Sequence, residues 1–147
     1  MEEKIQSYFD LNVWKKAHQL TLNVYKATST FPPSEQFTLT DQLKRTASAI
    51  TVGISDGFQR RNRQEKARLY IESQNYLNEI YYLLLLSKDL GFLSNDELLE
   101  NTQEIQRMLS GLIRSVLGIN KNNPPKNKEN NSDTLNIGNN IEDVDML

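Results

Sequence analysis

Positively charged side chains gather in one short stretch of the sequence. Five of them fall within nine residues and two precede them; the full set is Lys44, Arg45, Arg60, Arg61, Arg63, Lys66 and Arg68. Arginine and lysine bind phosphate through charge-assisted hydrogen bonds, so such a cluster suits RNA or another nucleic acid. These seven residues form the candidate nucleic-acid-binding site.

Acidic residues beside the cluster reduce its net charge. We expect three ion pairs, which join Asp56 to Arg60, Glu65 to Arg61 and Glu72 to Arg68. These three acids leave the five clustered bases with a net charge of +2. A single copy would therefore bind nucleic acid weakly, and an oligomer that repeats the cluster would bind it more tightly through avidity.

Residues that could act in catalysis are few. His18 is the single histidine and there is no cysteine. His18 shares a helix face with Trp14 and Tyr25, so we interpret it as a partly buried structural residue. We interpret Glu79, in an apolar stretch, as a partly buried acid that pairs with a base on a neighbouring helix. The known phosphate-loop and metal-binding motifs are missing from the sequence, so we expect no enzyme activity, metal, cofactor or small-molecule substrate.

The elements that must position these residues are four amphipathic segments, without the alternating pattern of strands between them. We expect helices at about residues 11–30, 39–56, 63–90 and 95–117. Their short connections favour an all-α, antiparallel up-down-up-down four-helix bundle over residues 1–119.

Local signals set the expected ends of these helices. Asp10 is the predicted N-cap of the first helix, Asn62 caps the third, and Ser94–Glu97 forms a capping box for the fourth. Gly57 is expected to end the second helix in a left-handed conformation. Gly53 lies inside that helix, and we interpret it as the site of a close helix crossing.

The third segment is apolar on every side between residues 80 and 86. A helix in a bundle normally keeps one polar face, so the excess predicts an interface between subunits. The expected interface residues are Ile80, Tyr81, Tyr82, Leu83, Leu85 and Leu86. The alternative is that Tyr81 and Tyr82 are partly exposed, with their hydroxyls in water.

The last segment, residues 120–147, is rich in asparagine and contains no aromatic residue. It cannot bury enough apolar surface to offset its ordering entropy, so we expect a disordered tail, although its final IEDVDML could be a docking peptide. Three of the 17 basic and five of the 19 acidic residues lie in the tail, which leaves residues 1–119 neutral. The acidic start lacks the apolar region of a signal peptide, and no apolar run approaches a membrane span. These features predict a cytoplasmic protein that does not contact the membrane.

Three stretches together resemble one protein family. They are FDLNVWKKAHQLTLNVYKATSTFP, then LTDQLKRTASAI followed by GISDGF, and YYLLLLSKDLGF. They resemble the four-helix-bundle family that includes proteins encoded within intervening sequences of 23S rRNA genes. This family is distantly related to the accessory protein of diversity-generating retroelements. That protein forms a basic pentameric barrel and works with reverse transcriptase and nucleic acid.

The chain departs from the usual family pattern at residues 49–57. There the proline and asparagine of Ser-Ile-Pro-x-Asn-Ile-Ala-Glu-Gly are missing, and Asp56 replaces the glutamate. In the third helix only Glu79 remains of two acids, with Tyr81 at the other position. The resemblance implies a homopentameric bundle without established enzyme activity.

These observations lead to three hypotheses of different classes. The first is a non-catalytic homo-oligomer, expected to be a pentamer, that binds RNA or a ribonucleoprotein through the basic residues. The second is a protein-binding adaptor that uses the tail or the third helix and does not contact nucleic acid. The third and weakest is an enzyme built around His18 or Glu79.

Overall fold

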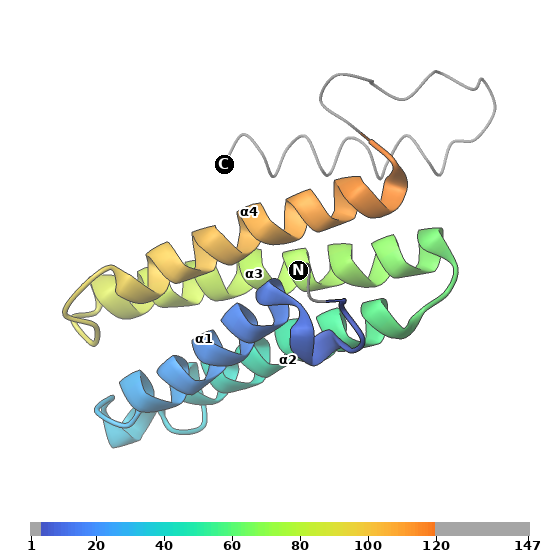
Figure 1. Cartoon of the computed structure of the whole chain (residues 1–147). Helices are drawn as coiled ribbons and strands as arrows, with labels where there is room; N and C mark the ends of the chain where they lie inside the picture. The colour runs from blue at the N-terminus through green and yellow to red at the C-terminus, as the bar shows by residue number, and fades with distance from the viewer. Residues whose placement is uncertain (1–3, 120–147) are drawn as a thin grey trace.

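A computed structural model describes residues 4–119 of the chain as four helices. The helices are α1 (Asn12–Thr28), α2 (Leu39–Gln59), α3 (Arg63–Asp89) and α4 (Glu97–Leu117), with short 3-10 turns at Tyr8–Asp10 and Pro33–Glu35. Each helix runs back along the one before it (Figure 1), and the described residues contain no strand. The predicted all-α four-helix fold is confirmed, whereas the disorder and docking peptide predicted for residues 120–147 lie outside the described part.

The core forms where the apolar faces of the four helices meet. Its central side chains have at most 1% of their surface exposed, and they include Ala17, Leu20, Val24, Leu43, Ala47, Ile50, Ile54, Leu77, Ile80, Leu84, Ile105, Leu109 and Ile113. Their spacing of three or four residues within each helix is the periodicity seen in the sequence.

The second and third helices cross closely at two glycines. A Cβ atom at Gly53 would lie 2.2 Å from Ser73 Oγ, and one at Gly57 would lie 2.6 Å from the ring of Tyr70. Ser73 Oγ also donates a hydrogen bond of 3.1 Å to the carbonyl of Ile50, which joins the two helices inside the core. The close crossing predicted at Gly53 is confirmed.

Gly57 does not end α2, contrary to the prediction. The helix continues to Gln59, and Gly57 is buried within it, with no left-handed conformation. The residue is small because the Tyr70 ring occupies the space of its side chain, so packing rather than capping explains the glycine. Gly118, with φ of 70°, does end α4 in the left-handed conformation.

The predicted caps are confirmed in one case of three. Asn62 Oδ1 accepts hydrogen bonds from the backbone N–H groups of Gln64 (2.9 Å) and Glu65 (3.1 Å) and so caps α3. The N-cap of α1 is Leu11, one residue after the predicted Asp10. Asp10 lies in the preceding 3-10 turn, where its carboxylate caps the backbone of that turn.

The capping box predicted at Ser94–Glu97 is also absent from the start of α4. Asp96 is the N-cap, and its side chain makes no capping hydrogen bond. Asn95 Oδ1 instead accepts from the N–H of Glu97 at 3.1 Å. Asp96 makes a short ion pair with Lys88 at the end of α3, which ties the α3–α4 connection together.

Candidate nucleic-acid interface

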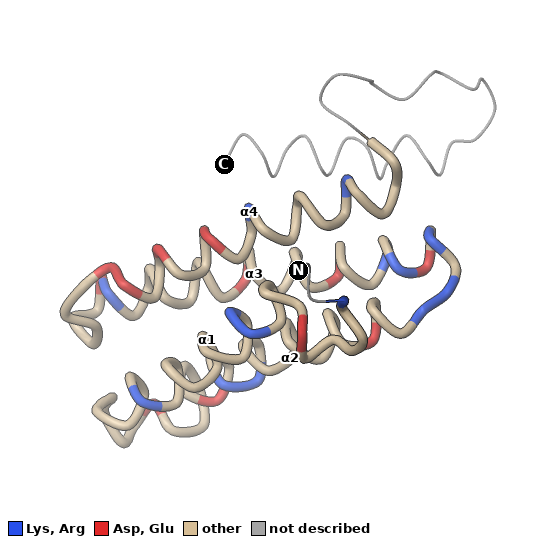
Figure 2. Tube along the Cα trace, viewed as in Figure 1, with Lys and Arg blue, Asp and Glu red and all other residues tan. Residues whose placement is uncertain are grey.

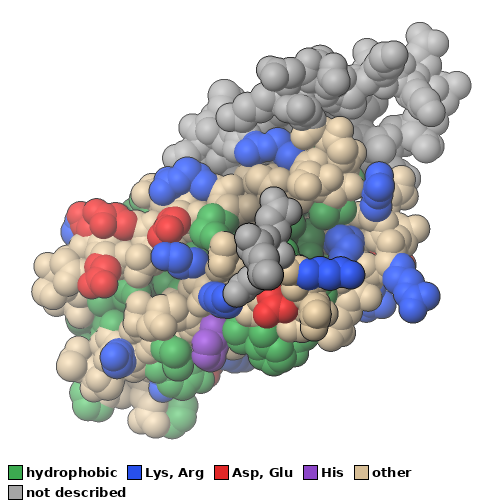
Figure 3. All heavy atoms as spheres, in the orientation of Figure 1, with side chains coloured by type: hydrophobic (Ala, Val, Ile, Leu, Met, Phe, Trp, Pro, Cys, Tyr) green, Lys and Arg blue, Asp and Glu red, His purple; other side chains and the backbone are tan. Residues whose placement is uncertain are grey.

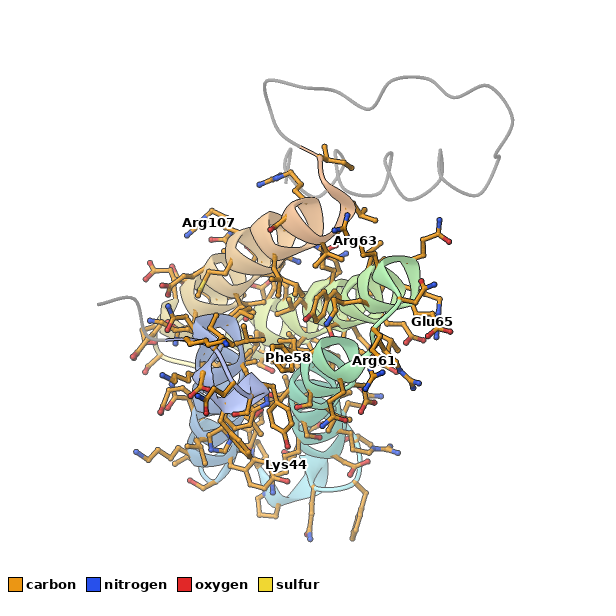
Figure 4. All side chains as sticks on the ribbon, turned by 45° about the vertical axis from the view of Figure 1, so that its right-hand side comes forward. Lys44, Phe58, Arg61, Arg63, Glu65 and Arg107 are labelled. Carbon is orange, nitrogen blue, oxygen red and sulfur yellow. The ribbon has the colours of Figure 1, made fainter. Side chains whose placement is uncertain are left out.

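The seven candidate basic residues lie in two separate groups. Lys44 and Arg45 are in the second turn of α2, whereas the other five surround its far end and the start of α3. Arg60 lies sixteen positions after Lys44, a distance of about 24 Å along a helix. Figure 4 shows Lys44 well apart from Arg61 and Arg63. The predicted single basic surface is therefore corrected to two groups.

Three arginines are freely available at the α2–α3 connection. Arg60, Arg61 and Arg63 are exposed, and their guanidinium groups make no ion pair or hydrogen bond within residues 4–119. The expected pairs with Asp56 and Glu65 do not form, while Arg68 does approach Glu72 at 3.9 Å. We call Arg60, Arg61 and Arg63 the end cluster; Figure 2 shows its basic segment at this connection.

The backbone of the connection holds the end cluster in place. Arg60 leaves α2 in an extended conformation, and the Asn62 cap fixes the start of α3 immediately before Arg63. Arg63 is the first residue of α3, where the helix dipole disfavours a cation by about 0.3–1 kcal/mol. An external anion at this position would remove that unfavourable interaction.

Lys66, also part of the predicted site, points back into the protein. Its Nζ donates a hydrogen bond of 2.6 Å to the carbonyl oxygen of Phe58 and lies 5.2 Å from the centre of the Phe58 ring. Burial lowers the pKa of Lys66. The side chain therefore satisfies a carbonyl in the last turn of α2 and positions the connection, and its assignment to the nucleic-acid-binding site stays a prediction.

The group on the second turn of α2 is engaged in local contacts. Arg45 makes an ion pair of 2.7 Å with Asp41, four residues earlier. The Nζ atom of Lys44 lies 4.7 Å from the centre of the Tyr25 ring on α1. Lys44 thus belongs to the seam between α1 and α2 and not to the end cluster.

The predicted subunit interface is only partly available. Ile80 and Leu83 are buried in the core of the same bundle, at 0% and 8% exposure. Their predicted place in a subunit interface is therefore wrong, because both are core residues. Tyr81 and Leu86 are half-buried. Tyr82, with 60% of its surface exposed, and Leu85, with 37%, are the apolar residues of this segment that face outward.

The residues considered for catalysis are both exposed. His18 stacks on Trp14, with ring centres 5.3 Å apart, so it lies beside an aromatic ring as predicted, but it is not buried. Glu79 is exposed and makes no ion pair in the described part of the chain, so the predicted buried pair is wrong. Within residues 4–119 no three acidic or histidine side chains come close enough to hold a metal ion.

The surface hollows show what else the bundle could hold. One, of about 320 Å³, lies between the end of α1 and the α3–α4 connection, where Lys26 and Glu97 are its charged lining residues. Another, of about 400 Å³, is lined by Asn78, Tyr81, Gln103 and Gln106 of α3 and α4. Both are open to solvent, and polar side chains contribute to the lining of each.

Sequence reasoning did not find the contacts that fix the aromatic side chains of α1. Trp14 Nε1 donates a hydrogen bond of 2.9 Å to Ser55 Oγ on α2. Trp14 also packs against Phe9, with ring centres 4.9 Å apart. The shared helix face of Trp14, His18 and Tyr25 was visible in the spacing, but the α2 partner depends on the register between two helices, which spacing within one helix does not give.

Comparison with known proteins identifies a family. The family model described as 23S rRNA-intervening sequence protein matches residues 9–111, which include the first three helices and most of the fourth. A search among curated proteins found no match. In the described part of the chain, every helix is too short or too polar to cross a membrane.

Proposed function

The chain belongs to the 23S rRNA-intervening sequence protein family, and from that premise we propose a non-catalytic, homo-oligomeric bundle that binds RNA or a ribonucleoprotein through the end cluster. The proposed setting is the cytoplasm, and the proposed assembly is the pentamer that the family resemblance implied. The observation that carries the proposal is the exposure of Arg60, Arg61 and Arg63 without a protein partner at the α2–α3 connection.

The charge of the end cluster suits a phosphate backbone. Its three guanidinium groups make no described ion pair that a ligand would have to break, and each can bind a phosphate through two hydrogen bonds. Arg63 would also gain from an anion, because it lies at the positive end of the α3 dipole. Three contacts give weak binding, so repetition of the cluster in an oligomer supports the affinity that a function requires.

The exposed face of α3 supports the oligomeric part of the proposal. Tyr82 and Leu85 are apolar and exposed within a helix whose other face already fills the core. The same observation favours a second candidate function, an adaptor that binds another protein through this face and does not contact RNA. The two functions differ in whether purified protein binds RNA without any other protein.

Gel shifts with a structured RNA over a series of salt concentrations test the proposal. We expect Arg61→Glu to weaken binding at every concentration and to reduce the slope of log affinity against log salt by about 1. The matched control is Arg107→Glu, because Arg107 is also exposed and has no described partner but lies on α4, away from Arg63 (Figure 4). Equal affinity of the wild-type protein and a variant with Arg60, Arg61 and Arg63 all changed to Glu would refute the site.

A further inference from the structure

The first helix carries only positive charge. α1 contains Lys15, Lys16 and Lys26 and neither aspartate nor glutamate, which gives it a net charge of +3. Lys16 lies 3.4 Å from Glu104 of α4. Lys15 and Lys26 are exposed and have no ion-pair partner in residues 4–119. Residues 1–119 are neutral overall, so the rest of the bundle carries a net charge of −3 and positive charge is concentrated on α1.

Aromatic rings lie along one face of this positive helix, and two of the three are exposed. Trp14, His18 and Tyr25 follow at intervals of four and seven residues, so they line up along α1. His18 is exposed, and its ring lies on that of Trp14 with an angle of 18° between the two planes. Tyr25 has 52% of its surface exposed. We call these three residues the α1 stripe; Figure 3 shows His18 at the surface between hydrophobic side chains.

Contacts with α2 fix the end of the α1 stripe at Trp14, on which the His18 ring stacks. The Trp14 indole is fixed by its hydrogen bond to Ser55, and the Ser55 hydroxyl donates in turn to the carbonyl of Thr51 at 3.1 Å. Half-way along the stripe the hydroxyls of Thr21 and Thr51 lie 3.4 Å apart. Rings that are already ordered lose little conformational entropy when a flat ligand stacks on them.

A third cation completes the stripe at its far end. Lys44 of α2 lies over the Tyr25 ring, while the neighbouring Arg45 is neutralised by Asp41. The stripe therefore combines two exposed rings, His18 and Tyr25, with the nearby charges of Lys15 and Lys44. Lys15 also interacts electrostatically with the carboxylate of Asp10. Aromatic rings among cations are the combination with which proteins bind single-stranded nucleic acid, because bases stack on the rings and phosphates contact the cations.

We propose that the α1 stripe binds single-stranded RNA, with bases stacked on His18 and Tyr25 and phosphates beside Lys15 and Lys44. His18 and Tyr25 are seven residues apart, about 10 Å along the helix, so a short oligonucleotide reaches both rings. Unpaired bases are required because stacking needs an open base face. The inference rests on the proposed function for its class of ligand, but it uses a surface separate from the end cluster.

Binding of a short labelled oligouridylate to the full chain, measured by fluorescence anisotropy, tests the inference. Removal of one stacked base costs roughly a factor of 5 to 150 in affinity, and we expect a loss in this range for His18→Ala and again for Tyr25→Ala. His18→Phe and Tyr25→Phe keep a flat ring and should retain binding. The matched control is Tyr76→Ala, since Tyr76 is 40% exposed but lies on α3.

Trp14 provides a second readout, because it is the only tryptophan in the chain. Its fluorescence should change when the oligouridylate is added to the wild-type protein and to Tyr76→Ala. Unchanged affinity in the His18→Ala, Tyr25→Ala double variant would overturn the inference. A changed molecular mass of that variant in light scattering, with its affinity intact, would also overturn it and would assign the stripe to contacts between copies.

The same assays separate this inference from the proposed function. The variant with all three end-cluster arginines changed to Glu should lose structured RNA and keep most of its oligouridylate binding, because the stripe lies elsewhere. The stripe alone would be refuted if that variant lost its affinity for structured RNA while oligouridylate binding did not depend on His18 and Tyr25. Oligouridylate binding that depends on His18 and Tyr25, with structured RNA unaffected by the arginines, would refute the end cluster alone.

Discussion

At the scale of single residues, Gly57 is the position where the packing of α2 against α3 is most demanding. In a Gly57→Ala variant the new Cβ would lie 2.6 and 2.7 Å from two atoms of the Tyr70 ring, which is buried and cannot easily move. We expect the free energy of unfolding, measured in urea, to fall by about 1–3 kcal/mol.

A second glycine provides the matched control for this prediction. Gly111 lies within α4, and a Cβ there would contact nothing within 4 Å. Gly111→Ala should therefore stabilise the protein by about 0.4–1 kcal/mol, since alanine restricts the unfolded chain. Equal unfolding midpoints for the two variants would contradict the close crossing.

Tyr70 should make the protein sensitive to alkaline pH. Burial raises the pKa of its hydroxyl from 10.0 to about 12. Between these two values the unfolded chain has lost this proton and the folded chain retains it, so the free energy of unfolding falls as the pH rises. Tyr70→Phe should show a shallower fall in stability over this range in urea titrations, and a slope equal to that of the wild-type protein would contradict the prediction.

The end cluster and Lys66 show how far residue-level reasoning extends. The sequence correctly indicates an accessible group of arginines, because exposure follows from their charge and from their place in a connection. It does not indicate that Lys66 turns inward to the Phe58 carbonyl, since that contact depends on the angle between α2 and α3. The Arg68–Glu72 pair was predictable because both residues lie in one helix, four positions apart. The absence of an Arg61–Glu65 pair was not predictable, because Arg61 lies before the start of α3.

At the scale of the elements, α3 and α4 are joined by a buried hydrogen bond. Gln74 Nε2 donates to Ser110 Oγ at 2.8 Å, and both residues are at most 2% exposed. Gln74→Met should lower the free energy of unfolding by about 1–3 kcal/mol, because it leaves a buried hydroxyl without its donor. In the double variant Gln74→Met, Ser110→Ala, the free energy of unfolding should fall by less than the sum of the decreases in the two single variants.

An exposed pair on the same two helices provides the control for this cycle. Gln106 Nε2 donates to Asn78 Oδ1 at the surface, where water can replace either partner. A double-mutant cycle on this pair, measured by urea unfolding, should give a coupling energy near zero. A coupling as large as that of the buried pair would show that burial is not the cause.

The positions of the four helices were predictable because each carries a long periodic apolar face. Their ends were less so: Gly57 was taken for a stop signal although it serves packing, and Ser94 matched the capping-box pattern but does not cap α4. A local pattern identifies residues able to cap, whereas the contacts of the neighbouring helix decide which of them do. The buried Gln74–Ser110 bond was not predicted, since it joins residues 36 positions apart.

At the scale of the whole molecule, the fold redistributes charge that looks continuous in the sequence. The basic residues from Lys44 to Arg68 divide between the α1–α2 seam and the α2–α3 connection, about 24 Å apart along α2. The acid-free α1 adds its lysines to the first group. The bundle thereby presents two groups of basic residues, which we propose bind the phosphates of a folded RNA and unpaired bases, respectively. RNA with a single-stranded segment beside a helix could occupy both at once, and the linked contacts would raise its affinity.

The proposed RNA binding depends on the assembly state, because each proposed surface would bind weakly in a single copy. We propose that Tyr82 and Leu85 lie at contacts between copies, so a Tyr82→Glu, Leu85→Glu variant should lose them. We expect light scattering to give a mass near five chains for the wild-type protein and a smaller mass for the variant, with unchanged helical content by circular dichroism. Phe37→Glu is the control, because Phe37 is 84% exposed but lies in the α1–α2 connection.

RNA binding should fall together with the assembly. With a single end cluster per particle, the variant should bind structured RNA at least ten-fold more weakly than the oligomer, since avidity commonly contributes 10²–10⁴. The loss should be smaller for a short oligouridylate that spans only one α1 stripe. A wild-type protein that is monomeric in solution would contradict the role of Tyr82 and Leu85, and the RNA affinity would then have to come from one copy of each surface.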